Sequence, residues 1–241
     1  MKSKTALAAI VLASIPLQGL GYAAYAQDAV DPAFMSKLEA ALEQKPELVL
    51  QAAARAQQRQ RDAEMQAMNV TATEVRRQLA VADNPGFVIG NPTGSATFIE
   101  YIDYRCGYCK RAHGEVNKLI AENPEARVVI VQLPVLGPDS ETLARFAIAA
   151  SMQGKFKQTH DYLYENTVSA DEAGLRSAAQ AIGLDWAKVQ QDMTSANVTV
   201  RLAANKSLGE QMNVQGTPFF ITPNRVIPGA TTADNLSADV G

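Results

Sequence analysis

The stretch Phe98–Lys110, FIEYIDYRCGYCK, holds the only two cysteines of this 241-residue chain, Cys106 and Cys109. Residues 96–101, ATFIEY, are mostly β-branched or aromatic, which predicts a strand, and the residues after the cysteines predict a helix through Ile120. The cysteine pair therefore lies where a strand passes into a helix. Such a pair can form a structural disulfide, a metal site or a reactive dithiol.

A reactive dithiol suits this position best. Zinc needs four ligands, and only His113 lies near the two cysteines in sequence. A disulfide that closes so short a loop constrains little of the unfolded chain, because stabilisation grows with loop length. Haem attachment needs a histidine where Lys110 stands. Two thiolates suffice for Cu(I), so copper binding at Cys106 and Cys109 stays open.

The helix start predicts different roles for the two thiols. Backbone N–H groups and the helix dipole at a first turn favour a thiolate at Cys106. Cys109 lies one turn further in, where it can attack a mixed disulfide formed on Cys106. Lys110, Arg111 and His113 add positive charge nearby.

Two further features fit redox chemistry. Glu100 lies inside the predicted strand, and a buried carboxyl there would have a raised pKa and could relay the proton of Cys109. The alternative is a strand residue that faces solvent. Thr217–Pro218 precedes an apolar run, and a cis bond there would bring backbone beside the dithiol; a proline at a strand entrance is also ordinary.

The order of elements predicts an α/β fold with a helical insertion. A second strand is predicted at residues 127–133, and residues 139–212 are helical throughout. Short strands at residues 219–221 and 225–227 follow as a hairpin. Strand, helix, strand, helical block and hairpin together indicate one α/β domain over residues 84–241, with Asn84–Gly86 as its boundary.

These features resemble the DsbA-like branch of the thioredoxin-fold disulfide oxidoreductases. The resemblance rests on the cysteine stretch, on Gly90–Pro92, on LPVLGPDS (Leu133–Ser140) and on GTPFFI (Gly216–Ile221). With its long helical N-terminus, the chain is most similar to the ScsC (suppressor of copper sensitivity protein C) group of this family, which are periplasmic thiol–disulfide proteins.

The resemblance implies a role for each site residue. It makes Cys106 the nucleophile, Cys109 the resolving thiol, Glu100 the buried acid and Pro218 the cis-proline beside the cysteines. Gly107–Tyr108 between the cysteines and Thr217 before the proline resemble disulfide isomerases more than strong oxidases, which carry Pro-His between their cysteines. The chain ends at Gly241, soon after the hairpin, so the family's final helix is expected to be short or missing, with one sheet face less covered.

Residues 27–83 predict a helical oligomerisation segment. Asp31–Pro32 marks a helix start, Pro46 a break, and Thr71-x-x-Glu74 resembles a capping box that would break the chain near Asn69. The apolar side chains are too few for a separate core, so we expect residues 31–80 to associate with copies of the chain. Packing against the chain's own domain and a solvated linker helix are the alternatives.

The first 26 residues read as a cleavable signal peptide. Lys2 and Lys4 precede a short apolar run, and Ala24–Ala26 supplies small residues for cleavage near Ala26. This predicts a protein that works outside the cytoplasm, and the resemblance to ScsC implies that the compartment is the periplasm. A buried N-terminal helix is the alternative. The formal net charge of -3 gives no reason to expect nucleic acid as a partner.

The sequence thus predicts a thiol–disulfide oxidoreductase, most simply a disulfide isomerase or reductase. Its expected partners are client proteins with disulfides, copies of itself, and a membrane-bound thiol–disulfide electron donor, because an oxidising compartment would otherwise oxidise the pair. No organic cofactor is required. A dithiol oxidase of the same fold and a Cu(I)-binding protein are the competing interpretations.

Overall fold

A computed structural model describes residues 31–81 and 87–240 of the chain. It divides into two compact units, one ending at Ala56 and the other beginning at Gln57. The predicted signal peptide, residues 1–26, and the predicted boundary at residues 84–86 lie outside the described residues.

Two helices open the described chain. Helix α1 spans Pro32–Gln44 and starts where the Asp31 carboxylate accepts a hydrogen bond from the N–H of Ala33. Helix α2 spans Glu47–Val81, so Pro46 separates the two helices as predicted. No residue of α1 is buried.

The predicted break near Asn69 is wrong, because α2 continues through it. Thr71 does not cap a new helix; its hydroxyl donates back to the carbonyl of Ala67, 3.2 Å away. A Thr-x-x-Glu pattern inside a helix has this alternative bond within reach.

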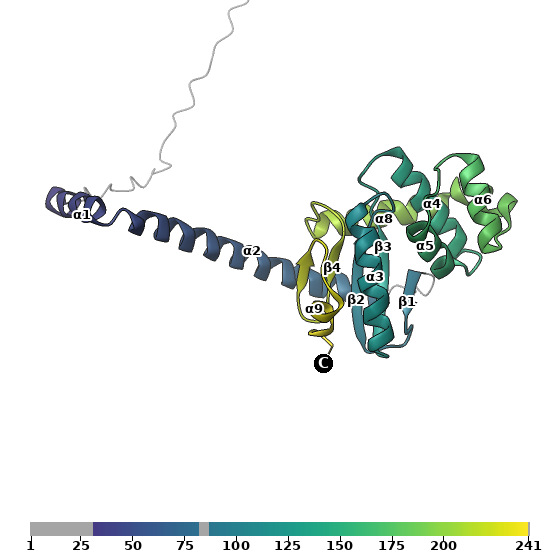
Figure 1. The fold of residues 1–241 in the computed structure, drawn as a ribbon, viewed down its shortest axis with the longest axis horizontal. Helices are drawn as coiled ribbons and strands as arrows, with labels where there is room; N and C mark the ends of the chain where they lie inside the picture. The colour runs from purple at the N-terminus through teal and green to yellow at the C-terminus, as the bar shows by residue number, and fades with distance from the viewer. Residues whose placement is uncertain (1–30, 82–86, 241) are drawn as a thin grey trace, which may run out of the picture. The chain divides into compact units, whose positions relative to one another are not determined.

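The second unit is built on a five-stranded sheet with the order β1-β3-β2-β4-β5 (Figure 1). The strands are β1 (Val88–Gly90), β2 (Ala96–Ile102), β3 (Ala126–Gln132), β4 (Phe219–Ile221) and β5 (Val226–Pro228). Strands β2 and β3 run parallel, and the other neighbours are antiparallel. Strand β1 was not predicted, because three residues carry no readable alternation.

Helices fill the connections of the sheet. Helix α3 (Gly107–Glu122) follows β2, and a helical block lies between β3 and β4. The block comprises α4 (Pro138–Ser151), α5 (Phe156–Glu165), α6 (Glu172–Ile182), α7 (Trp186–Met193) and α8 (Ala196–Gln211), close to the predicted limits of 139 and 212. The whole is an α/β fold with a helical insertion, as the sequence predicts.

The final helix is short but not missing. Helix α9 spans Ala233–Ser237, and its Ala233 and Leu236 are both fully buried. They belong to the same apolar cluster as Val116 and Leu119 of α3. The helix is therefore short, as expected, and it still contributes apolar side chains to the core on the α3 side of the sheet.

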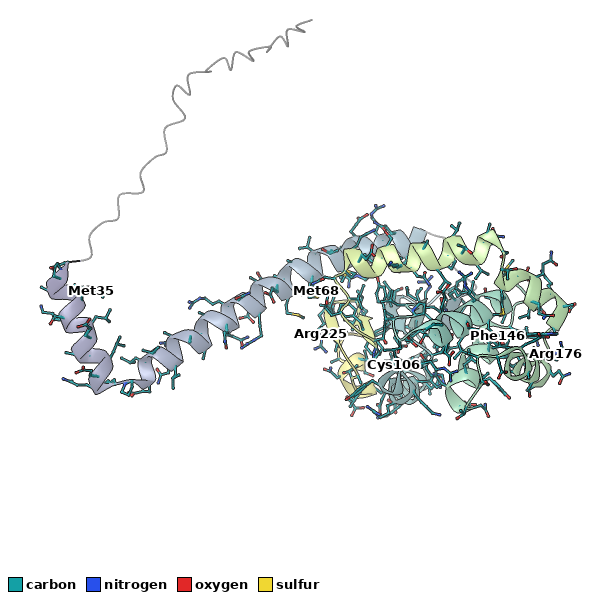
Figure 2. All side chains as sticks on the ribbon, turned by 90° about the horizontal axis from the view of Figure 1, so that it is seen from above. Met35, Met68, Cys106, Phe146, Arg176 and Arg225 are labelled. Atoms are coloured by element: carbon teal, nitrogen blue, oxygen red, sulfur yellow. The ribbon has the colours of Figure 1, made fainter. Side chains whose placement is uncertain are left out.

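The two faces of the sheet carry separate apolar cores. Phe98 and Ile102 of β2 pack in the core that includes α3, α9 and the helical block. Ile99 and Tyr101 point to the opposite face, since successive strand side chains alternate. Figure 2 shows the end of α2 and α8 together along one side of the domain, with Cys106 labelled toward the other.

The second face is covered by α2. Ala72, Val75 and Leu79 are buried against Ile99, Tyr101 and their neighbours in one cluster. The side-chain amide oxygen of Asn69 also accepts a hydrogen bond from the N–H of Val226, at 2.9 Å. The predicted domain of residues 84–241 is therefore incomplete by itself, because residues 69–79 supply part of its core. Here α2 packs against the chain's own domain, which was the alternative interpretation.

None of the described helices is both long and apolar enough to cross a membrane.

Candidate active site

Cys106 and Cys109 lie at the start of α3. Cys106 is the residue immediately before the helix, which begins at Gly107, so its side chain sits where backbone N–H groups are unpaired. Both cysteines are free thiols; 8% of Cys106 and none of Cys109 is exposed. The thiol of Cys106 donates a hydrogen bond to the carbonyl of Thr217, with an S–O distance of 3.2 Å.

The surroundings shift the pKa values of the two thiols in opposite directions. Burial tends to raise the pKa of Cys106, but hydrogen bonds from the Cys109 N–H, Thr217, the Cys109 thiol and the Tyr108 N–H outweigh it, so the pKa lies below its ordinary value. Burial raises the pKa of Cys109 well above the ordinary value. Cys106 is therefore the thiol that ionises first.

Strand pairing brings Thr217 and Pro218 to the cysteines. Phe219 of β4 pairs with Tyr101 of β2, so the residues just before β4 lie beyond the carboxyl end of β2. The Thr217–Pro218 peptide bond is cis. An open pocket beside it is lined by Thr217, Pro218, Phe219 and Met68 of α2, among others.

Glu100 lies beneath the cysteines and not in solvent. It is 2% exposed, and the alternation of β2 directs it to the face that holds Phe98, Ile102 and Cys109. Burial raises the pKa of Glu100 to about 8. The carboxyl is therefore mostly protonated at neutral pH and can exchange a proton near that pH.

The positive charge expected around the site is only partly present. His113 is buried, and burial lowers the pKa of its ring, so at neutral pH it is uncharged. The Arg111 guanidinium lies 4.2 Å from the ring centre of Tyr108, which is 62% exposed. Arg111 and Tyr108 thus form part of the solvent-facing rim, whereas His113 belongs to the core.

Sequence reasoning missed Asp103, three residues before Cys106. It is 1% exposed, and its carboxylate accepts hydrogen bonds from the N–H groups of Arg105, Val135 and Leu136. Buried carboxylates with several such bonds are uncommon. The readable signal was an Asp at the end of a strand and just before a helix, which is typical of a side-chain-stabilised turn.

Within residues 31–81 and 87–240, no group of three or more His, Cys, Asp or Glu side chains is arranged to hold a metal ion. Cu(I) held by two thiolates would involve fewer ligands than such a group, so it stays an alternative.

Curated relatives share this domain as one part of larger proteins. The chain is 30% identical over 155 residues to a Na(+)/H(+) antiporter NhaA 1 of Salinispora arenicola, a match that covers 64% of this chain and 24% of the antiporter. The chain thus spans about a quarter of the length of the curated relatives it matches.

Solved structures show the same fold. A thioredoxin-like oxidoreductase from Silicibacter pomeroyi is 34% identical, with a TM-score of 0.61 over 66% of this chain and 96% of that one. BcfH of Salmonella enterica Typhimurium is 27% identical, with a TM-score of 0.72 over 87% and 94%.

The predicted likeness to ScsC holds at the level of the fold. Proteus mirabilis ScsC, in a transitional conformation, is 22% identical, with a TM-score of 0.62 over 86% of this chain and 94% of that one.

The family description "DSBA-like thioredoxin domain" matches residues 97–241, more than half of the sequence. This range contains the cysteine pair, the helical block and the Thr217–Pro218 bond. The chain belongs to the DSBA-like thioredoxin domain family.

Proposed function

We propose that this protein is a thiol–disulfide oxidoreductase that acts on protein disulfides, as an isomerase or reductase, through Cys106 and Cys109. The observation that carries the proposal is the inequality of the two thiols. Cys106 lies at a helix start with a lowered pKa, whereas Cys109 is fully buried with a raised pKa. Such a pair suits one attacking and one resolving thiol.

The Cys106 thiolate attacks one sulfur of a client disulfide, forms a mixed disulfide and releases one client thiolate. In reduction, the deprotonated Cys109 attacks the Cys106 sulfur, forms the Cys106–Cys109 disulfide and releases the second client thiolate with two electrons. In isomerisation, another client thiolate attacks the mixed disulfide instead, which returns Cys106 reduced with no net electron transfer.

Glu100 and Thr217 support these steps. The proton of Cys109 must leave a buried site before Cys109 can attack, and the Glu100 carboxyl beneath it has a pKa near neutrality. The Thr217 backbone lies within hydrogen-bond distance of Cys106 and can face the client chain at the mixed disulfide. Pro218 follows Thr217 directly and lines the same open pocket.

Isomerase or reductase activity is favoured over dithiol oxidation by the N-terminal helices. Exposed apolar side chains gather on α1 and the first turn of α2: Phe34, Met35, Leu38, Leu48, Val49 and Leu50. Self-association through them would present several copies of Cys106 to one misfolded client. We therefore assign self-association to residues 32–50 of the predicted segment 31–80, because Ala72, Val75 and Leu79 are buried against the sheet.

We further propose that the protein works in the periplasm and receives electrons from a membrane-bound donor. The signal-peptide interpretation of residues 1–26 places the protein in the periplasm, where dithiols are oxidised unless a partner reduces them. A membrane-bound thiol–disulfide donor would supply two electrons per reduced client disulfide. A dithiol oxidase would need an electron acceptor instead.

Replacing each cysteine by serine in turn tests the proposal. Cys106→Ser should abolish reduction of insulin disulfides, and Cys109→Ser should accumulate mixed disulfides that resolve on adding dithiothreitol. Iodoacetamide at pH 6 should modify Cys106 and spare Cys109, as read by peptide mass spectrometry. Modification mainly at Cys109 would reverse the assigned roles. Activity lost on adding a Cu(I) chelator would favour the copper-binding alternative.

A further inference from the structure

The residue that the exchange scheme leaves unexplained is Asp103. Its carboxylate and its backbone carbonyl together make five hydrogen-bond contacts around the cysteine turn, although it lies three residues from Cys106. A carboxylate that is 1% exposed loses its hydration and needs such partners to remain in place.

The first set of contacts fixes the turn before Cys106. One carboxylate oxygen accepts from the Arg105 N–H at 2.7 Å, and the Asp103 carbonyl accepts from the Cys106 N–H at 3.0 Å. The Tyr164 hydroxyl donates to the same carbonyl at 3.3 Å. An aspartate whose side chain accepts a hydrogen bond from the N–H two residues later closes a tight turn, and this turn places Cys106 at the start of α3.

The second set ties this turn to another part of the chain. The other carboxylate oxygen accepts from the N–H groups of Val135 and Leu136, at 2.8 and 3.0 Å. Both belong to the loop Leu133–Gly137 between β3 and α4. The side chains of Val135 and Leu136 are 53% and 59% exposed, so the carboxylate holds their backbone while their apolar groups face solvent.

We infer that Asp103 is a positioning residue for thiol–disulfide exchange, which fixes the turn presenting Cys106 and ties it to the loop Leu133–Gly137. The inference rests on the proposed function, since it concerns how Cys106 is aimed. The hydrogen bonds to Cys106 come from Tyr108, Cys109 and Thr217. They can form together only if the turn sets Cys106 at one place relative to α3 and β4.

In Asp103→Asn, the direction in which the pKa of Cys106 shifts distinguishes a positioning role of Asp103 from an effect of its charge. The amide has one acceptor oxygen, so if it faces the two loop N–H groups, its NH₂ group faces the Arg105 N–H and the turn loses its bond. The pKa of Cys106, read from the pH dependence of its alkylation rate, should rise by about one unit, the worth of roughly one lost hydrogen bond. Removal of a nearby negative charge would by itself lower this pKa.

Asp139→Asn is the matched control. Asp139 pairs with the Arg105 side chain at 3.1 Å, is mostly exposed, and does not bond the turn backbone. The same loss of charge there should leave the pKa of Cys106 unchanged or slightly lower. An unchanged or lowered pKa in Asp103→Asn would overturn the inference. The readout needs no turnover, so it stands apart from the client assays that test the proposed function.

A second measurement uses the wild-type protein, in case Asp103→Asn does not fold. The amides of Arg105, Val135 and Leu136 should exchange their hydrogens at least about tenfold more slowly than in an unstructured chain, because one carboxylate holds all three. Exchange of the Val135 and Leu136 amides at unstructured-chain rates would show that the tie does not exist and would overturn the inference.

Discussion

The two ends of α2 have the same helical backbone and opposite surroundings. At its start, Leu48, Val49 and Leu50 are between 39% and 74% exposed, whereas near its end Val75 and Leu79 are at most 5% exposed. The composition of the helix hardly distinguishes these ends, because both carry scattered apolar residues among Ala, Gln and Arg. What differs is the neighbour: the end of α2 lies on a sheet face of its own domain.

The two ends of α2 are therefore expected to have different roles. The buried end is part of the fold, and its apolar side chains contribute to the stability of the second unit. The exposed start contributes nothing to that core, so its apolar side chains are free for contact with another chain. A cut between the two ends should therefore separate assembly from folding.

Truncation at two positions should show the largest effect. A protein that begins at residue 81 lacks Ala72, Val75 and Leu79, which leaves Ile99, Tyr101, Phe219 and Ile221 uncovered, and it should not fold cooperatively. A protein that begins at residue 57 keeps this cover and should fold, reduce insulin and run as a monomer. Circular dichroism on heating and light scattering measure both outcomes.

The same pair of truncations tests the proposed assembly. The protein that begins at residue 57 should lose activity on scrambled disulfides while it keeps insulin reduction. A cooperatively folded protein that begins at residue 81 would refute the structural role of α2. Full-length protein that is already monomeric at micromolar concentration would remove the main support for isomerase activity.

Two valines five positions apart sharpen the comparison within α2. Val75 is fully buried and Val70 is 74% exposed. Val75→Ala should lower the free energy of unfolding by about 2 kcal/mol, from lost burial and the cavity left behind. Val70→Ala should change it by less than about 0.5 kcal/mol, and toward higher stability, because alanine favours helices. Urea unfolding of both variants measures the difference; equal effects would contradict the assigned burial.

A pH-dependent effect concerns the sheet face turned away from α2. The folded pKa of Glu100 is about 8, above the ordinary value of 4.5, so the folded state binds its proton more tightly. This stabilisation is complete below pH 4.5 and is lost as the pH rises toward 8. The free energy of unfolding should fall by up to about 1.4 kcal/mol per pH unit across this window, and Glu100→Gln should remove that slope.

Two controls accompany the Glu100 measurement. Glu122→Gln changes an exposed glutamate and should keep the wild-type slope. The protein that begins at residue 57 should show the same slope as the full chain, because Glu100 faces α3 and not α2. A slope that survives in Glu100→Gln would assign the pH dependence to another group.

The position of the cysteine pair between a strand and a helix, and the succession of the later elements along the chain, were readable because their signals are local. Strand β2, the helix start after Cys106 and the Thr217–Pro218 strand entrance each follow from a few adjacent residues. The sequence did not show which surface the end of α2 packs against. An amphipathic stripe shows that a helix has an apolar face, but Val75 and Leu79 do not identify the surface that covers them.

Asp103 escaped sequence reasoning for a related reason. A turn aspartate is common, and its bonds to Val135 and Leu136 join residues 32 and 33 positions apart in the chain. The break predicted from Thr71 and Glu74 failed because tertiary packing of Ala72 and Val75 favours an unbroken helix over a local cap.

The bond from Cys106 to the Thr217 carbonyl joins residues 111 positions apart. During synthesis, Cys106 emerges well before Thr217, so a growing chain carries the dithiol without the strand β4 that completes its surroundings. The separate hydrogen bond from Thr217 that helps to lower the pKa of Cys106 can form only when β4 has been made and has paired with β2. The hydrogen bonds from Cys109 and Tyr108 need only the start of α3, so the acidity of Cys106 is built in two stages, one local and one that waits for β4.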